Sequence, residues 1–416
     1  MSLGVGATVA LTPPLGAARG GPELVEGPEL LRAFQQSGKL IQRTIPSSGE
    51  MVPAVGVHYG NPAPPDHAAL KDVLKTLLDN GGRFLDTVHG NSPTEEVTAT
   101  IATELGVQDR VFWSSRASPA GPPPPGPAAD AAKAQMERSA TRFKVSRLGL
   151  VLMNPMADPG HLAALKEMKK EGRVRYIGMQ VIDDRQYAGL EAVMRKEPID
   201  FIGIDYSIGN RAAEQTILPL AQERKIGVVA YFPFDAGGLF QRVGTTPLPS
   251  WAAEFDARTW AQFFVKYVIS NPAVTVVRTG TSKANHMLEN IGGGSGRLPN
   301  QATRKRMAEL VDSWPLAGTA VSPAPKGAAV VVPADVMDRY AGEYKTAAGP
   351  IIIRRVGSAL QVKTGNAEEA ALVARSQTRF SDPWGSIVEF QLDPGGVVSG
   401  LIMQQGQLKI QASRIR

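Results

Sequence analysis

The sequence predicts a (β/α)8 barrel followed by a small antiparallel β domain, and two patterns support that prediction. Between residues 54 and 278, eight short apolar runs alternate with amphipathic segments. Apolar strands that are joined by helices indicate a parallel sheet, and eight such units indicate a closed barrel. After Trp314 the pattern changes to short alternating strands broken by Gly, Asp and Pro, which is typical of an antiparallel β domain.

Each element of the barrel can be placed on the sequence. The segment IQRTIPSSGEMVPAVGV predicts a hairpin that leads into the first strand, at 54–57. Further strands are predicted at 83–87, 111–115, 148–154, 174–180, 201–207, 228–233 and 274–278. Amphipathic stretches predict helices at 66–80, 94–104, 132–144, 161–171, 185–195, 211–224 and 256–269. Active sites of such barrels lie at the carboxyl ends of the strands, near which the sequence places Asp86, Arg116, Met153, Gln180 and Tyr206.

Changes in composition divide the chain into four parts. Residues 1–39 form a leader or arm, 40–314 the barrel, 315–334 a Pro- and Ala-rich linker and 335–416 the β domain. The first twenty residues, MSLGVGATVALTPPLGAARG, resemble the later part of a bacterial export signal. They predict a periplasmic or exported protein, with a cytoplasmic location as the alternative.

Composition also limits the partners that we expect. The absence of cysteine excludes disulfides, thiolate catalysis and Cys-ligated zinc. The net charge of +6 is spread among acids, so it predicts a solvated surface rather than a nucleic-acid face. No stretch reaches the roughly 20 apolar residues of a membrane span. A small-molecule ligand is therefore the expected partner.

Several motifs together resemble the aldo/keto reductase family over about residues 40–312. They are FLDTVHGNSPTEE (84–96), GRVRYIG (172–178), ILPLAQERKIGVVAYFPFDAGGLF (217–240) and GTSKANHMLEN (280–290). The segment LPSWAAEFDARTWAQFFVKYVISNPAVT (248–275) is most similar to the branch with an exported leader. The resemblance implies the barrel fold, carbonyl reduction and NADP(H) as the cofactor.

The C-terminal domain resembles the one appended to serine β-lactamase-like proteins. The matching segments are RYAGEY (339–344), RSQTRF (375–380), VEFQLD (388–393) and GVVSGLIMQQ (396–405). The domain contains no His and no nucleophile with a partner, so we expect it to bind, pack or oligomerise rather than to catalyse.

Three of the family's four catalytic positions carry other residues here. The resemblance assigns the catalytic Asp to Asp86, the Tyr position to Asn91, the Lys position to Arg116 and the His position to Met153. An Asn amide has no proton of useful pKa to give to a carbonyl, and Arg cannot share a proton with a phenol as Lys does. Ordinary carbonyl reduction is therefore expected to be lost.

The cofactor positions divide into two groups. Gln180, Val181 and Gly203 replace the residues that grip the nicotinamide amide in the family, whereas Tyr231 keeps an aromatic ring where the nicotinamide stacks. The positions near the adenosine phosphate and adenine are retained, namely Thr281, Lys283, His286, Glu289 and Asn290. The resemblance thus implies a nucleotide end that is partly kept and a reacting end that is rebuilt.

Other residues could restore chemistry to the site. His89 lies just past Asp86 and is the best substitute acid or base, since imidazole titrates near neutrality. His58 lies at the neighbouring strand end and could take part. Asp86, His89 and His58 do not have the spacing of a known metal motif, so no metal site is predicted. The Asp86–Arg116 pair could be a structural ion pair, or Arg116 could bind a substrate carboxylate or phosphate.

Three functional hypotheses follow. The first is a rebuilt barrel that binds a small polar or anionic molecule and runs acid–base chemistry without redox. The second is an NADP(H)-dependent carbonyl oxidoreductase in which His89 replaces the phenol. The third is a non-catalytic binding or scaffold protein whose C-terminal domain makes the partner or oligomer contacts.

Overall fold

The computed structural model divides the chain into two compact units, Met1–Ala317 and Gly318–Arg416. In the first unit it describes residues 39–59, 66–87, 93–117, 128–155 and 159–314. In the second it describes 332–346, 349–357, 359–364, 370–374, 376–381, 387–393, 395–405 and 408–415. The leader residues 1–38, the linker residues 315–331 and the candidates His89 and Asn91 lie outside the described residues.

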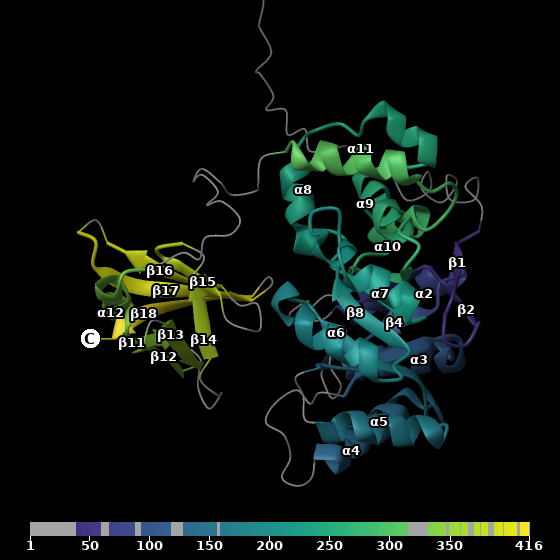
Figure 1. Cartoon of the computed structure of the whole chain (residues 1–416), viewed down its shortest axis with the longest axis horizontal. Coiled ribbons are helices and arrows are strands. Elements are labelled where there is room, and N and C mark those ends of the chain that lie inside the picture. Colours follow the sequence, from purple (N-terminus) through teal and green to yellow (C-terminus); the bar gives the residue numbers. More distant parts are fainter. Residues whose placement is uncertain are drawn as a thin grey trace, which may run out of the picture. The chain divides into compact units, whose positions relative to one another are not determined.

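The first unit contains a closed parallel barrel, as the sequence predicts (Figure 1). Its strands, in the order in which they pair around the barrel, are β10 (Val274–Gly280), β3 (Val55–His58), β4 (Phe84–Asp86), β5 (Phe112–Arg116), β6 (Leu148–Met153), β7 (Val174–Val181), β8 (Phe201–Asp205) and β9 (Gly227–Tyr231). The barrel closes where β10 pairs with β3, with Gly280 opposite His58.

The predicted hairpin is present before the first barrel strand. Strands β1 (Gln42–Thr44) and β2 (Met51–Pro53) pair antiparallel. Ile45 and Val52 of this hairpin are fully buried in one cluster with Phe84 and Phe112, which stand early in barrel strands β4 and β5. The hairpin therefore packs against the amino end of the barrel interior.

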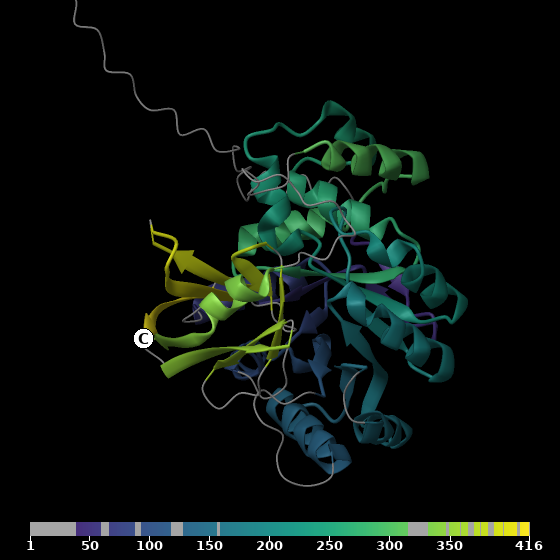
Figure 2. The ribbon, with the colours of Figure 1, turned by 60° about the vertical axis from the view of Figure 1, so that its left-hand side comes forward.

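Helices cover the outside of the barrel. The longer ones are α2 (His67–Asp79), α3 (Pro93–Leu105), α4 (Ala128–Phe143), α5 (Pro159–Lys170), α6 (Tyr187–Lys196), α9 (Trp260–Ile269), α10 (Ala284–Gly293) and α11 (Gln301–Asp312). Shorter ones are α7 (Ile217–Glu223) and α8 (Gly238–Val243). Figures 1 and 2 both show α4 and α5 side by side. None of the described helices is long and apolar enough to cross a membrane.

Three predicted helix starts are wrong by four residues or more. The helix predicted at 132–144 begins at Ala128. The helix predicted at 211–224 begins only at Ile217, because residues 212–214 form a separate short 3-10 turn. The helix predicted at 256–269 begins at Trp260, because the side chain of Thr259 accepts from the Gln262 amide and caps it there. Asp256 instead has φ 58° and ends the preceding 3-10 helix.

Side chains alternate along each strand between the barrel interior and the helix layer. The interior holds Phe84, Phe112, Tyr176 and Phe201 in a run of ring contacts, with centroids 5.4, 6.0 and 5.6 Å apart. These rings stand at the early positions of their strands and fill the amino half of the barrel. The later interior positions are therefore left for the polar residues of the mouth.

The second unit is itself a closed barrel, made of eight antiparallel strands. The strands are β11 (Gly342–Thr346), β12 (Gly349–Val356), β13 (Ala359–Thr364), β14 (Ala370–Ala374), β15 (Arg379–Ser381), β16 (Ile387–Leu392), β17 (Val398–Gln405) and β18 (Leu408–Ile415). Helix α12 (Ala334–Tyr340) precedes them, and its Tyr340 stacks on Phe390 of the barrel core at 4.1 Å. The predicted antiparallel β domain is confirmed, and the structure shows that its sheet closes into a barrel.

Candidate active site

Asp86 and Arg116 form a bidentate ion pair at the barrel mouth. They end the neighbouring strands β4 and β5, and both are buried. Arg116 Nη1 donates to Asp86 Oδ1 and Nη2 to Oδ2, each at 2.9 Å. This fork geometry is the strongest way in which a guanidinium holds a carboxylate.

A second arginine, Arg278 of β10, also holds Asp86. Its Nη1 donates to Asp86 Oδ2 at 2.8 Å, and its guanidinium lies 4.2 Å from the ring centroid of Tyr231. Arg278 is buried, and its Nε has no hydrogen-bond partner among the described residues. We did not predict Arg278 as a site residue, although its position two residues after the inward-facing Val276 places it on the interior side.

Tyr231 contacts both of these arginines. Its hydroxyl accepts from Arg116 Nη2 at 2.8 Å, and its side chain is 0% exposed. A Cβ added to Gly203 would stand 2.4 Å from that hydroxyl, so the missing side chain at 203 makes the space that the phenol occupies. The amide oxygen of Gln180 accepts a further hydrogen bond from Arg116 Nε.

The family's nicotinamide does not fit this end of the site as it stands. The ring that would stack on it is fully buried under Arg278, and the Gln180 oxygen that could hold its amide already accepts from Arg116. Tyr231 therefore offers no exposed ring face, and the Gln180 oxygen keeps only one of its two lone pairs for another donor.

The charges of the cluster are fixed at neutral pH. Burial alone would raise the pKa of Asp86, but the charges of Arg116 and Arg278 outweigh it and hold that pKa below its usual range. Burial raises the pKa of the Tyr231 hydroxyl. One carboxylate against two guanidiniums leaves one positive charge in surplus. The cluster can attract an anion, but it contains no group that exchanges a proton near pH 7.

His58 stands beside this cluster at the end of β3. A carbonyl oxygen can only accept, so His58 Nδ1 donates to the Tyr59 carbonyl at 3.0 Å and Nε2 carries no proton. Burial, together with the charge of Arg278, lowers the pKa of His58 to about 3. The imidazole is therefore neutral at pH 7 and cannot serve as a general acid at that pH. Among the described residues, no group of three His, Asp or Glu is placed to hold a metal ion.

Among the described residues of the mouth, Asp205 has a pKa near neutrality. It ends β8 opposite Tyr231, and the interior position of Phe201 four residues earlier puts it on the same side. Burial raises the pKa of Asp205 to about 7. A hydrogen bond that Asn210 Nδ2 donates to its carboxylate at 3.0 Å lowers the pKa, but burial outweighs it. The pairing of β8 with β9 fixes the side of the sheet on which Asp205 lies.

Met153 does not reach the mouth. It is buried in the core cluster between the barrel and the helices, whereas Leu150 and Leu152 belong to the interior cluster. The assignment of the family's His position to Met153 therefore does not place a side chain at the site. The alternation puts the next residue, Asn154, on the interior side of β6.

The positions near the adenosine end are brought together by one loop and one helix. Thr281 follows β10, and its Oγ1 accepts from the Lys283 amide at 3.0 Å, which shapes the turn into α10. His286, Glu289 and Asn290 lie on α10 itself. Burial lowers the pKa of His286 and raises that of Glu289. These five candidates form one segment, and Tyr231 stands apart from them on β9.

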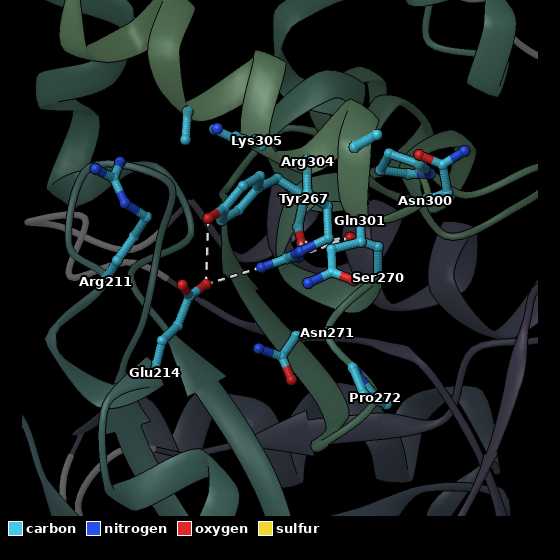
Figure 3. A pocket seen from close by; sticks show the side chains of 13 residues that line it. Arg211, Glu214, Tyr267, Ser270, Asn271, Pro272, Asn300, Gln301, Arg304 and Lys305 are labelled. Atoms are coloured by element: carbon cyan, nitrogen blue, oxygen red, sulfur yellow. Dashed lines mark hydrogen bonds and ion pairs between the residues drawn. The ribbon is translucent and has the colours of Figure 1, made fainter.

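A large cavity of about 1120 Å³ lies away from the mouth, beside α9 and α11 (Figure 3). Arg304 is central to its wall: it donates to Glu214 Oε1 at 2.8 Å and to Ser270 Oγ at 2.7 Å. Tyr267 donates to the same Glu214 oxygen at 3.2 Å, and its ring lies 4.1 Å from the Arg304 guanidinium. The polar groups of this wall largely satisfy one another, so we interpret the network as the attachment of α11.

Comparison with known proteins agrees with this architecture. The profile of the aldo/keto reductase family matches residues 56–308. A curated relative, probable aldo-keto reductase 1 of Glycine max, is 25% identical over 293 residues, covering 60% of this chain and 80% of the relative. An aldo-keto reductase structure from Bacillus halodurans (holo form) is 19% identical, with a TM-score of 0.53, and covers 65% of this chain and 96% of that one. An aldo/keto reductase from Klebsiella pneumoniae in complex with NADP and acetate is 20% identical, with a TM-score of 0.53, and covers 65% and 95%. Because the family match spans more than half of the sequence, the chain belongs to the aldo/keto reductase family.

Proposed function

We propose that the barrel mouth binds a small anionic molecule and no longer performs ordinary NADP(H)-dependent carbonyl reduction. The observation that carries this proposal is the shared carboxylate. Asp86 supplies one negative charge to the two buried arginines Arg116 and Arg278, and in the described part of the chain Arg278 Nε has no hydrogen-bond partner. A buried surplus charge with an unused donor favours a carboxylate or phosphate group as its counter-ion.

The loss of reduction rests on three separate changes. The family's phenol position is Asn91, its Lys position is Arg116, and the stacking ring of Tyr231 is covered. Removal of general acid catalysis costs about 10² to 10⁴ in rate, and loss of carbonyl positioning adds to that cost. Efficient hydride transfer would need all three changes to be compensated.

The acid–base part of the proposal assigns proton transfer to Asp205. Its pKa of about 7 lets it release and take up a proton at physiological pH. Asp86 is held ionised by its arginines, and His58 is held neutral. We therefore propose non-redox proton transfer to or from an anion held by Arg278, with Asp205 as the exchanging group.

One observation favours the alternative, an NADP(H)-dependent oxidoreductase with His89 as the acid. The segment from Thr281 to Asn290 retains the residue types of the family's adenosine end and gathers them on one loop and one helix. The similar Klebsiella pneumoniae protein holds NADP in its structure. A nucleotide could be bound by this end alone, so only a direct measurement separates the two functions.

The test is calorimetric titration of the full chain with NADPH, NADP⁺, malonate and acetate. We expect malonate to bind to the native protein and to bind about tenfold more weakly to Arg278→Gln. Its affinity should be unchanged in the control Arg224→Gln, whose arginine is exposed at the end of α7. We expect no heat from millimolar nucleotide. Micromolar NADPH binding, followed by carbonyl reduction that His89→Ala abolishes, would instead establish the alternative.

A non-catalytic role is proposed for the C-terminal barrel. Its surface exposes the apolar side chains of Val356, Leu392 and Val397, the last 63% exposed. We propose that these side chains contact another chain, as contiguous exposed apolar patches do. Light scattering of the full chain and of Val397→Lys tests self-association: an equal, monomeric mass for both proteins would exclude it.

A further inference from the structure

A small cavity of about 210 Å³ lies at the amino ends of the barrel strands, at the end opposite the mouth. Four arginines line it: Arg83 stands just before β4, Arg110 before β5, Arg147 before β6, and Arg175 near the start of β7. Nothing in the mouth chemistry involves these residues. Convergence of four like charges on so small a space needs a physical explanation, because their mutual repulsion disfavours it.

Two of the four arginines are held in fixed positions. Arg83 Nη2 donates to Glu50 Oε1 at 3.0 Å, and Arg175 donates to Glu50 Oε2. Their guanidiniums also lie over the rings of Phe112 and Tyr176, at 5.9 and 5.4 Å from the centroids. A single hairpin carboxylate thus orients both arginines in advance of any ligand, so binding need not order them.

The other two arginines lack a counter-charge. In the described part of the chain, neither Arg110 nor Arg147 makes an ion pair, and both are exposed. The acids of the cluster are Asp109 in the cavity wall and Glu50 behind it. Four guanidiniums against two carboxylates leave a surplus of two positive charges.

We propose that this cavity is a binding site for a phosphate- or sulfate-type dianion. The surplus charge equals the charge of such an ion, and the planar guanidinium fork matches its oxygens. Pockets for drug-sized ligands occupy about 300–1000 Å³. The cavity, at about 210 Å³, therefore suits a free oxyanion or the phosphate end of a small ester rather than a whole nucleotide. Its distance along the strands from the mouth makes it a separate site from that of the proposed function.

The experiment is calorimetric titration of the full chain at pH 8 and low salt with inorganic phosphate, sulfate, glycerol 3-phosphate and acetate. We expect the dianions to bind and acetate to bind at least about tenfold more weakly. Tighter binding of glycerol 3-phosphate than of inorganic phosphate would identify an ester as the ligand, and the reverse order a free oxyanion. Both results support the site.

The decisive variant is Arg110→Gln with Arg147→Gln, which leaves the Glu50 contacts intact. Its matched control is Arg138→Gln with Arg224→Gln, two exposed arginines outside the cavity that make no ion pair among the described residues. Both pairs remove two positive charges. We expect phosphate binding to weaken about tenfold or more in the first pair only. Equal weakening in both pairs, equal binding of acetate and phosphate, or no phosphate binding to the native chain would overturn the proposal. Because the mouth arginines are untouched, malonate binding reports on the proposed function independently.

Discussion

Arg278 donates to Asp86 over 2.8 Å, although 192 positions separate the two residues in the chain. Arg278 belongs to β10 and Asp86 to β4, and β3 lies between these strands in the barrel. Closure of the barrel therefore creates the contact. It makes Asp86 the shared counter-ion of the two arginines Arg116 and Arg278.

The shared carboxylate predicts an order of stability among variants. Asp86→Asn leaves two buried guanidiniums without a counter-charge and is expected to lower the free energy of unfolding by about 3–5 kcal/mol. Arg278→Met leaves the bidentate Asp86–Arg116 pair intact and is expected to cost about 1 kcal/mol. Urea denaturation at pH 7 measures both values. A larger loss in Arg278→Met than in Asp86→Asn would contradict the assignment of surplus positive charge.

Asp205 predicts a pH dependence of stability with a definite sign. Its pKa rises from 3.8 to about 7 on folding, so between these pH values the folded state keeps a proton that the unfolded state has released. The stabilisation is complete below pH 3.8 and is lost as the pH rises through about 7. We expect Asp205→Asn to match the native protein at about pH 3.5, below the unfolded pKa, and to be more stable at pH 8. The exposed Asp72→Asn serves as control, and an unchanged difference at the two pH values would refute the shifted pKa.

Met153→His tests the orientation of β6. The new imidazole would enter the apolar core between barrel and helices, so we expect a loss of about 1–3 kcal/mol and no carbonyl reductase activity. Met153→Leu, which conserves volume and polarity, should cost less than about 1.5 kcal/mol. Denaturation curves and an NADPH oxidation assay give the two readouts. A stable Met153→His protein that gains activity would show that this side chain faces the mouth.

The Arg304 network predicts that this part-buried arginine attaches α11, whereas the neighbouring Lys305 does not. Arg304→Met removes hydrogen bonds to Glu214, Ser270 and the backbone of Tyr267, and should cost about 3 kcal/mol. Lys305 is 79% exposed, so Lys305→Met should change stability by less than about 0.5 kcal/mol. Thermal unfolding of both variants makes the comparison. Equal effects would mean that the network contributes nothing specific.

Local patterns in the sequence were sufficient for the barrel and for part of its mouth. Runs such as Leu148–Met153 are apolar throughout and bounded by amphipathic segments, which is a local signal of a parallel strand. The same runs placed Asp86 and Arg116 at strand ends. The helix starts at Ile217 and Trp260 were missed because a 3-10 turn and a Thr cap decide them over one or two residues.

The roles of the mouth residues could not be predicted in the same way. Arg278 was not predicted as a site residue, and Met153, which was expected near the mouth, lies in the core between the barrel and the helices. An error of one residue moves a side chain to the other face of a strand, so register decides which residues can meet.

By itself, the sequence determined the fold class and the order of the elements, because these depend on the local periodicity of apolar residues. Its motifs carried the resemblance to the family. Only the tertiary structure decided which charges share the mouth. Asp86 meets Arg278 through barrel closure, and Asp205 acquires its raised pKa from burial beside Tyr231. Contact between distant residues and the loss of solvent around a charge arise only when the whole barrel is packed, so no local pattern contains them.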